Sequence, residues 1–169
     1  MKSIFPGSFV TFDAMKPGTA FMYRDDSEQI QFAMKAHYPA PKKDYAIRFI
    51  KGSDAKPTSV LLSLNPGFAR ARTLLSIDGL EIAPVDRYSF VGPSELDDNP
   101  IESGWLGVAG KRSILTFTIQ PPADQKIGYI DLETGELFDE LPIAVWYQSW
   151  RITLPNKSDS ELIFEMKAM

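Results

Sequence analysis

Residues 127–154, IGYIDLETGELFDELPIAVWYQSWRITL, decide the fold because they join a hairpin signal to the densest aromatic run in the chain. Gly135 has no Cβ and enters the left-handed conformation without a steric penalty. We therefore expect a type I turn over Glu133 and Thr134, with Gly135 as a G1 bulge in a three-residue hairpin loop. Pro142 has no N–H to donate, so it interrupts the ladder after this hairpin.

Residues 143–154 follow that interruption without any Gly or Pro and are rich in β-branched and aromatic types. Side chains alternate between the two faces of a strand. One face then carries Trp146, Trp150, Ile152 and Leu154, with Gln148 among them. The other face becomes polar towards the end of the segment. The pattern predicts one long strand whose tryptophans belong to the core.

The same alternation recurs in most of the chain. Ile30, Phe32, Met34, Ala36 and Tyr38 alternate with Gln29, Gln31, Lys35 and His37. A period of two with one polar face is typical of a half-buried antiparallel strand. His37, the only histidine, is expected on the solvent side of this strand in a structural role, because the sequence supplies no partner for general-base chemistry.

Turn signals divide the remaining segments. Asp78-Gly79 lies between two apolar pairs and predicts a tight type I′ hairpin. Residues 68–75 fit a single helical turn or an extended segment equally well, whereas residues 162–167 alternate and favour a terminal strand. Nothing in the chain has the pattern of a long amphipathic helix. We expect a single β-rich domain over residues 1–169, an antiparallel β-sandwich or flattened barrel of about nine to eleven strands with little helix.

Composition excludes several classes of function. The chain of 169 residues is 44% hydrophobic and 12% aromatic, which is enough for a packed core. The absence of cysteine excludes thiol catalysis, disulfides and cysteine-based metal sites. A single histidine excludes a multi-histidine metal site. No apolar run reaches the length of a membrane span, and no signal peptide is recognisable, so we expect a soluble, cytoplasmic protein without a membrane partner.

The net charge of −4 is concentrated in one place. Residues 95–102, ELDDNPIE, carry four acidic and no basic side chains, so the rest of the chain sums to zero. No broad basic field exists, and nucleic acid is not an expected partner. Glu95, Asp97 and Asp98 are the candidate catalytic acids and bases or Ca²⁺ ligands, although the loop has no EF-hand pattern. The simpler interpretation is a solvated acidic loop.

Residues 92–112 form the longest stretch without periodicity, and such loops are usually functional or mobile. The segment GWLGVAGKRS at 104–113 departs from a phosphate-binding loop, because five residues separate its outer glycines and Arg112 follows Lys111. Trp105 lies among glycines and is expected to be an exposed ligand-binding residue. Arg70 and Arg72 project to one side if extended, and could pair with the acidic loop or bind an anionic partner.

These observations favour a non-catalytic binding or assembly module, with residues 92–112 as the preferred contact region. Its partner would be an unknown protein or a second copy of the chain, and no cofactor is expected. Function on such folds normally lies in loops on a rigid scaffold. Two alternatives stay open: a hydrolase or lyase that uses the carboxylates of the acidic loop, and a small-ligand carrier with an aromatic-lined interior.

Overall fold

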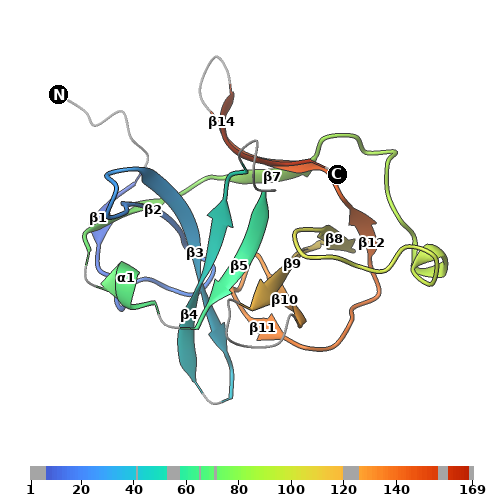
Figure 1. The fold of residues 1–169 in the computed structure, drawn as a ribbon, viewed down its shortest axis with the longest axis horizontal. Coiled ribbons are helices and arrows are strands. Elements are labelled where there is room, and N and C mark those ends of the chain that lie inside the picture. The colour runs from blue at the N-terminus through green and yellow to red at the C-terminus, as the bar shows by residue number, and fades with distance from the viewer. Residues whose placement is uncertain are drawn as a thin grey trace.

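The fold is almost entirely β, as the sequence predicts. A computed structural model describes residues 7–40, 42–52, 58–64, 66–70, 72–119, 126–155 and 160–167. Within these ranges the chain forms fourteen strands, one short α-helix and one 3-10 turn (Figure 1). The strands exceed the expected number because several are only two to five residues long. Neither helical element in the described ranges is long and apolar enough to cross a membrane.

The elements follow one another along the chain in a simple order. They are β1 (Phe9–Val10), β2 (Ala20–Arg24), β3 (Ile30–Tyr38), β4 (Lys43–Ile50), β5 (Ser59–Ser63), α1 (Gly67–Arg70), β6 (Leu74–Ile77), β7 (Glu81–Pro84), η1 (Pro93–Glu95), β8 (Leu106–Ala109), β9 (Arg112–Ile119), β10 (Ile127–Asp131), β11 (Leu137–Phe138), β12 (Val145–Tyr147), β13 (Trp150–Pro155) and β14 (Ser160–Met166).

Two sheets of very different size pack together. The large sheet has eleven strands in the order β1-β6-β2-β3-β4-β5-β9-β10-β11, with β8 paired to β9 and β12 to β8. Its strands are antiparallel except for the parallel pair β5 and β9. The small sheet has the order β14-β13-β7. Its strands run steeply across those of β3, β4 and β5 (Figure 1).

The main core lies between these sheets and is built from aromatic contacts. Trp150 and Phe164 of the small sheet lie 6.3 Å and 5.3 Å, ring centroid to ring centroid, from Phe49 of β4. The indole N–H of Trp150 donates to the carbonyl oxygen of Gly104 at 2.6 Å, so its one polar group is satisfied. Trp146 and Trp150 are both fully buried, which confirms their assignment to the core.

The prediction of one strand over residues 143–154 is wrong. β12 pairs with β8 in the large sheet, whereas β13 pairs with β7 and β14 in the small sheet. The chain passes between the sheets at Gln148 and Ser149. This break has a packing reason: Trp146 fills a cluster with Tyr129 under β8, and Trp150 fills the separate core between the sheets.

The hairpin around Gly135 is present, with a loop one residue longer than predicted. Gly135 has φ +71°, and an added Cβ would lie 2.0 Å from the backbone nitrogen of Gly18. The N–H of Asp131 donates to Glu136 O at 3.0 Å, so four residues, 132–135, form the loop. The Asp131 carboxylate closes it by accepting the N–H groups of Glu133 and Thr134.

Asp78-Gly79 does not close the predicted tight hairpin. β6 pairs with β1 and β2 in the large sheet, and β7 pairs with β13 in the small sheet. Gly79 does have the left-handed backbone that the sequence predicts, with φ +74°. It serves a connection that carries the chain from one sheet to the other. The strand prediction for the terminal segment is confirmed by β14, and residues 68–75 divide between α1 and β6.

Replacing Trp146 by alanine should lower the free energy of unfolding by about 3–5 kcal/mol, because a fully buried aromatic side chain is lost and a cavity remains. Urea denaturation followed by circular dichroism measures this change. Ile143, which is 87% exposed, is the matched control, and Ile143→Ala should change stability by less than about 0.5 kcal/mol. Equal stability of the two variants would contradict the core assignment.

A second prediction concerns acid stability. Burial alone would raise the pKa of Asp131, but hydrogen bonds from Arg112, Thr134 and Glu133 outweigh it and lower that pKa below its ordinary value. A lowered pKa in the folded state stabilises the protein above the ordinary pKa of aspartate, ~3.9, and this stabilisation is lost as the pH falls through the lowered value. The difference in the free energy of unfolding between the wild type and Asp131→Asn, measured by chemical denaturation at each pH, should therefore become smaller below about pH 4. A difference that stays constant down to pH 2 would refute this.

Candidate functional site

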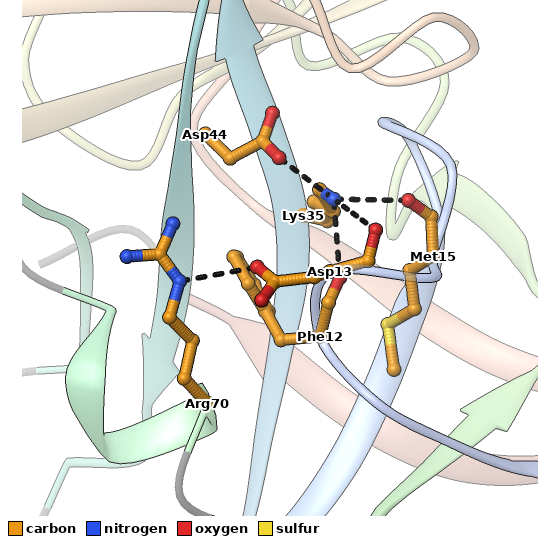
Figure 2. A network of polar contacts seen from close by, with 6 residues as sticks. All are labelled: Phe12, Asp13, Met15, Lys35, Asp44 and Arg70. Carbon is orange, nitrogen blue, oxygen red and sulfur yellow. Dashed lines mark hydrogen bonds and ion pairs between the residues drawn. The ribbon is translucent and has the colours of Figure 1, made fainter.

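A buried lysine with four polar contacts lies at a position that the sequence wrongly places on a solvent face. Lys35 of β3 is 2% exposed. Its ammonium donates to the carbonyl oxygens of Phe12 at 3.1 Å and Met15 at 3.0 Å, with a longer bond to Asp13 O at 3.4 Å. It also forms an ion pair of 2.8 Å with Asp44 Oδ2 (Figure 2).

Residues 11–16 produce this burial by folding over the outer face of the large sheet. Phe12 and Met15 pack there with residues of β2, β3, β4 and β6. The Lys35 ammonium lies 5.0 Å from the centroid of the Phe12 ring. A second ion pair, Arg70 Nε to Asp13 Oδ1 at 3.1 Å, ties α1 to the same segment (Figure 2).

This lysine does not have the surroundings of a catalytic amine. A nucleophilic lysine needs a neutral amine and an open approach for the substrate. The three N–H bonds of the ammonium are directed at four surrounding oxygens, with an aromatic ring beside them. The geometry therefore supports a cross-link between residues 11–16 and the sheet.

Arg70 and Arg72, which the sequence suggests as partners of the acidic loop or of an anion, form ion pairs with residues outside that loop. Arg70 binds Asp13, while the guanidinium of Arg72 binds the carboxylate of Asp26 and donates to the carbonyl oxygen of Arg24. These contacts bind the neighbouring turns to the sheet. A role in holding an anionic ligand stays a prediction for both residues.

The acidic loop is held by one of its own carboxylates. Glu95 Oε2 accepts the N–H of Gly92 at 2.7 Å, and Glu95 O accepts the N–H of Asn99 at 3.0 Å. Asp97 and Asp98 are exposed. Across the described residues, no three histidine, aspartate or glutamate side chains are grouped so that they could hold a metal ion. A catalytic role for Glu95, Asp97 and Asp98 stays a prediction.

Trp105 is buried, and the prediction that it is exposed is wrong. The residue is 7% exposed and packs with Ile114, Tyr129 and Trp146. The backbone N–H of Trp105 donates to Thr116 Oγ1 at 2.7 Å, and this bond holds the segment before β8 against β9. β8 and β9 then form a regular hairpin, so the second half of residues 92–112 is less irregular than its composition suggests.

His37 is half-buried rather than solvent-facing. Its backbone N–H donates to the carbonyl oxygen of Gly135 at 2.9 Å, which attaches β3 to the hairpin loop. The hairpin therefore covers this end of the strand. The Nδ1 atom of the His37 side chain is buried without a hydrogen-bond partner in the described part of the chain.

A large hollow lies between the two sheets within the described residues, and we call it the inter-sheet groove. It encloses about 560 Å³. Its lining residues come from β2, β3, β4, β6, β13 and β14, and the apolar ones are Met22, Ile30, Phe32, Phe49, Ile50, Leu75, Ile77, Leu154, Leu162, Ile163 and Phe164. A shallower hollow of about 500 Å³ adjoins it and shares Met22, Ile30 and Leu75.

The floor of this groove is part of an apolar row that crosses six strands. Directly paired residues on neighbouring strands share a face. The strand registers place in one such row Phe9, Leu75, Met22, Phe32, Phe49 and Val60. Exposure rises along it from 0% at Val60 to 76% at Phe9. The small sheet covers one end of the row and leaves the other end open to solvent.

The rim of the groove carries little net charge. Lys51 and Glu161 oppose one another in sign, and Gln29 and Gln31 are neutral. In the adjoining hollow Arg24 pairs with Glu28, and Arg72 is paired as described above. The surroundings therefore favour an uncharged apolar occupant.

Sequence patterns alone did not identify this groove. Alternation correctly placed Ile30 and Phe32 on the apolar face of their strand, but whether that face is covered depends on strand order. Ile30 is 66% exposed and Phe32 is buried, although they are two residues apart. Phe9 lies in β1, a strand of two residues that is too short to show an alternating pattern.

Comparisons with protein families, with curated proteins and with solved structures find no match to this chain.

Lys35→Met should destabilise the protein by about 3–5 kcal/mol, because removing one partner of a buried ion pair leaves the other groups unsatisfied. Chemical denaturation measures the loss, and amide exchange should quicken first in residues 11–16. Lys43→Met is the matched control on the neighbouring strand, since Lys43 is exposed, and should cost less than about 0.5 kcal/mol. If Lys35→Met unfolds at the wild-type denaturant concentration, the proposed cross-link does not stabilise the fold.

Proposed function

We propose that this chain is a non-catalytic binding or assembly module whose contact surface is the inter-sheet groove. The observation that carries the proposal is the open end of the apolar row: Phe9 is exposed in the adjoining hollow, and Ile30 and Leu162 are exposed beside the groove of about 560 Å³. Exposed apolar patches of this kind are often interaction sites in soluble proteins. Hollows of roughly 300–1,000 Å³ with apolar walls are the usual size of binding sites.

The polar groups of the molecule support a binding role more than a catalytic one. Lys35, Arg70 and Glu95 are each engaged in contacts within the chain. The groove itself has an apolar floor and a rim of mixed polarity. A partner would be held there by burial of apolar surface, to which each buried methylene contributes ~0.8 kcal/mol.

The exposed part of residues 92–112 is a second proposed contact region. Asp97, Asp98 and Asn99 are exposed on a loop whose ends are fixed by Glu95 and Trp105. Such a loop would add charged contacts at the periphery of an interface. It is distinct from the groove and can be tested separately.

A small-ligand carrier is the second candidate function, favoured by a further hollow that shares Phe32 and Ile77 with the groove. This hollow encloses about 370 Å³ between the sheets. A ligand retained there would appear in native mass spectrometry of freshly purified protein as a defined mass above that of the chain. The same spectrum would report self-association.

The groove is tested with the uncharged apolar fluorescent probe N-phenyl-1-naphthylamine. The wild type should enhance its fluorescence, and Ile30→Asp should reduce the binding constant at least tenfold by placing a charge in the mouth of the groove. Because Ile30 is 66% exposed, the melting temperature should stay close to that of the wild type. Ile143 is 87% exposed and lies outside the groove, so Ile143→Asp should bind the probe as the wild type does. Equal binding by both variants would refute the proposal.

A further inference from the structure

The uncovered end of the apolar row has features that favour one class of partner over others. Resting on the proposed binding function of the groove, we infer that its occupant is an extended, uncharged segment of another protein with apolar residues at alternate positions. This segment would lie beside β14 and extend the cover that the small sheet provides. Four observations support this assignment: area, spacing, strand edge and charge.

The three most exposed apolar side chains at the groove and its adjoining hollow offer less area than the apolar part of a stable dimer interface, which is about 450 Å² per partner. Phe9, Ile30 and Leu162 are 76%, 66% and 53% exposed. Large apolar side chains carry on the order of 150–200 Å² each, so these three offer on the order of 350 Å². A stable interface between folded proteins buries about 800 Å² per partner. A single short segment that inserts its side chains into the groove needs no more than this face provides.

The spacing of the row matches an extended chain. Phe32 of the row is on β3 and Phe9 is on β1, three strand positions apart in the large sheet, and Ile30 lies two residues from Phe32 on the same face of β3. Neighbouring strands lie ~4.8 Å apart, so these positions are separated by about 14 Å. Three alternate side chains of an extended segment also span about 14 Å. The strands of the small sheet already cross the large sheet in this direction over the covered half of the row (Figure 1).

β14 offers an edge to which such a segment can bind. It is the terminal strand of the small sheet and pairs with β13 on one side only within the described residues. Residues 161–164 of this strand line the groove. An extended peptide that joins a sheet edge gains main-chain hydrogen bonds, while pockets for alternate side chains give specificity.

The rim favours a segment without net charge. Lys51 and Glu161 balance one another, and the arginines of the adjoining hollow are paired with acidic side chains. Binding should then depend little on salt, because it is driven by apolar burial and not by charge. An anionic membrane surface would be bound more weakly as salt is added.

The experiment is a selection of displayed random peptides of about twelve residues on the wild-type protein, with counter-selection on Ile30→Asp. Enriched peptides should carry apolar residues at positions i, i+2 and i+4. By fluorescence anisotropy they should bind Ile30→Asp at least tenfold more weakly than the wild type, and Ile143→Asp within about twofold of it. Raising sodium chloride from low to high concentration should change the affinity by less than about twofold.

Amide exchange locates the bound peptide. Peptide binding should slow exchange in residues 161–164 of β14 at least fivefold. Apolar residues at i, i+3 or i+4 and i+7 would indicate a bound helix and overturn the inference, as would unchanged exchange in β14. So would a dimer in sedimentation that Ile30→Asp abolishes, or preferential binding to anionic vesicles.

The two proposals fail in different ways. If no peptide is enriched while the fluorescent probe still distinguishes Ile30→Asp from Ile143→Asp, the extended-segment inference is wrong and the groove remains a binding surface. If the probe makes no such distinction, the binding function itself is refuted.

Discussion

The difference in size between the two sheets is the constraint on which this structure depends. An eleven-stranded sheet presents two broad faces, and apolar side chains on each must be removed from water. Three crossing strands can cover only part of the inner face. Trp150 and Phe164 pack on Phe49 at that face, and beyond them the same apolar row becomes more exposed until Phe9, which is 76% exposed. The groove is thus a direct consequence of how far the small sheet extends.

Apolar side chains on the outer face of the large sheet are removed from water by a different kind of cover. Residues 11–16 lie over this face, and α1 is attached to them through Arg70 and Asp13. The cover is irregular backbone, whose carbonyl groups need donors when they are buried. Lys35 supplies these donors from the sheet beneath, and Asp44 balances its charge. A lysine at this position therefore fastens the cover over β2, β3, β4 and β6 on the outer face, whereas the described residues provide no comparable contact at the open end of the inner face.

The sequence predicts local conformation well and spatial neighbours poorly. Alternation identified β3 and β14, and the left-handed backbone of Gly135 and Gly79 followed from the absence of a Cβ. Gly79 nevertheless joins two sheets, because a turn signal reports backbone shape and not which strands pair. The long aromatic segment divides between the sheets for the same reason: Trp146 and Trp150 fit one face of a strand, but the packing places them in different clusters. Burial of Trp105 and Lys35 depends on contacts with Thr116 and with residues 11–16, distant in sequence.

The same distinction explains why the sequence points to charged residues as the candidate site, whereas the structure points to apolar residues. Charged side chains are often interpreted as functional in a sequence. In the structure, however, Arg70 binds Asp13, Arg112 binds Asp131, and Glu95 accepts the N–H of Gly92. Apolar side chains in alternating strands suggest core, yet Phe9 and Ile30 are exposed because the cover ends before it reaches them. In this fold, loops are fastened by internal ion pairs, and the surface that we propose for a partner is the part of the core that the chain does not cover itself. Binding at such a surface would complete the fold, so occupancy of the groove should stabilise the small sheet as well as hold the partner.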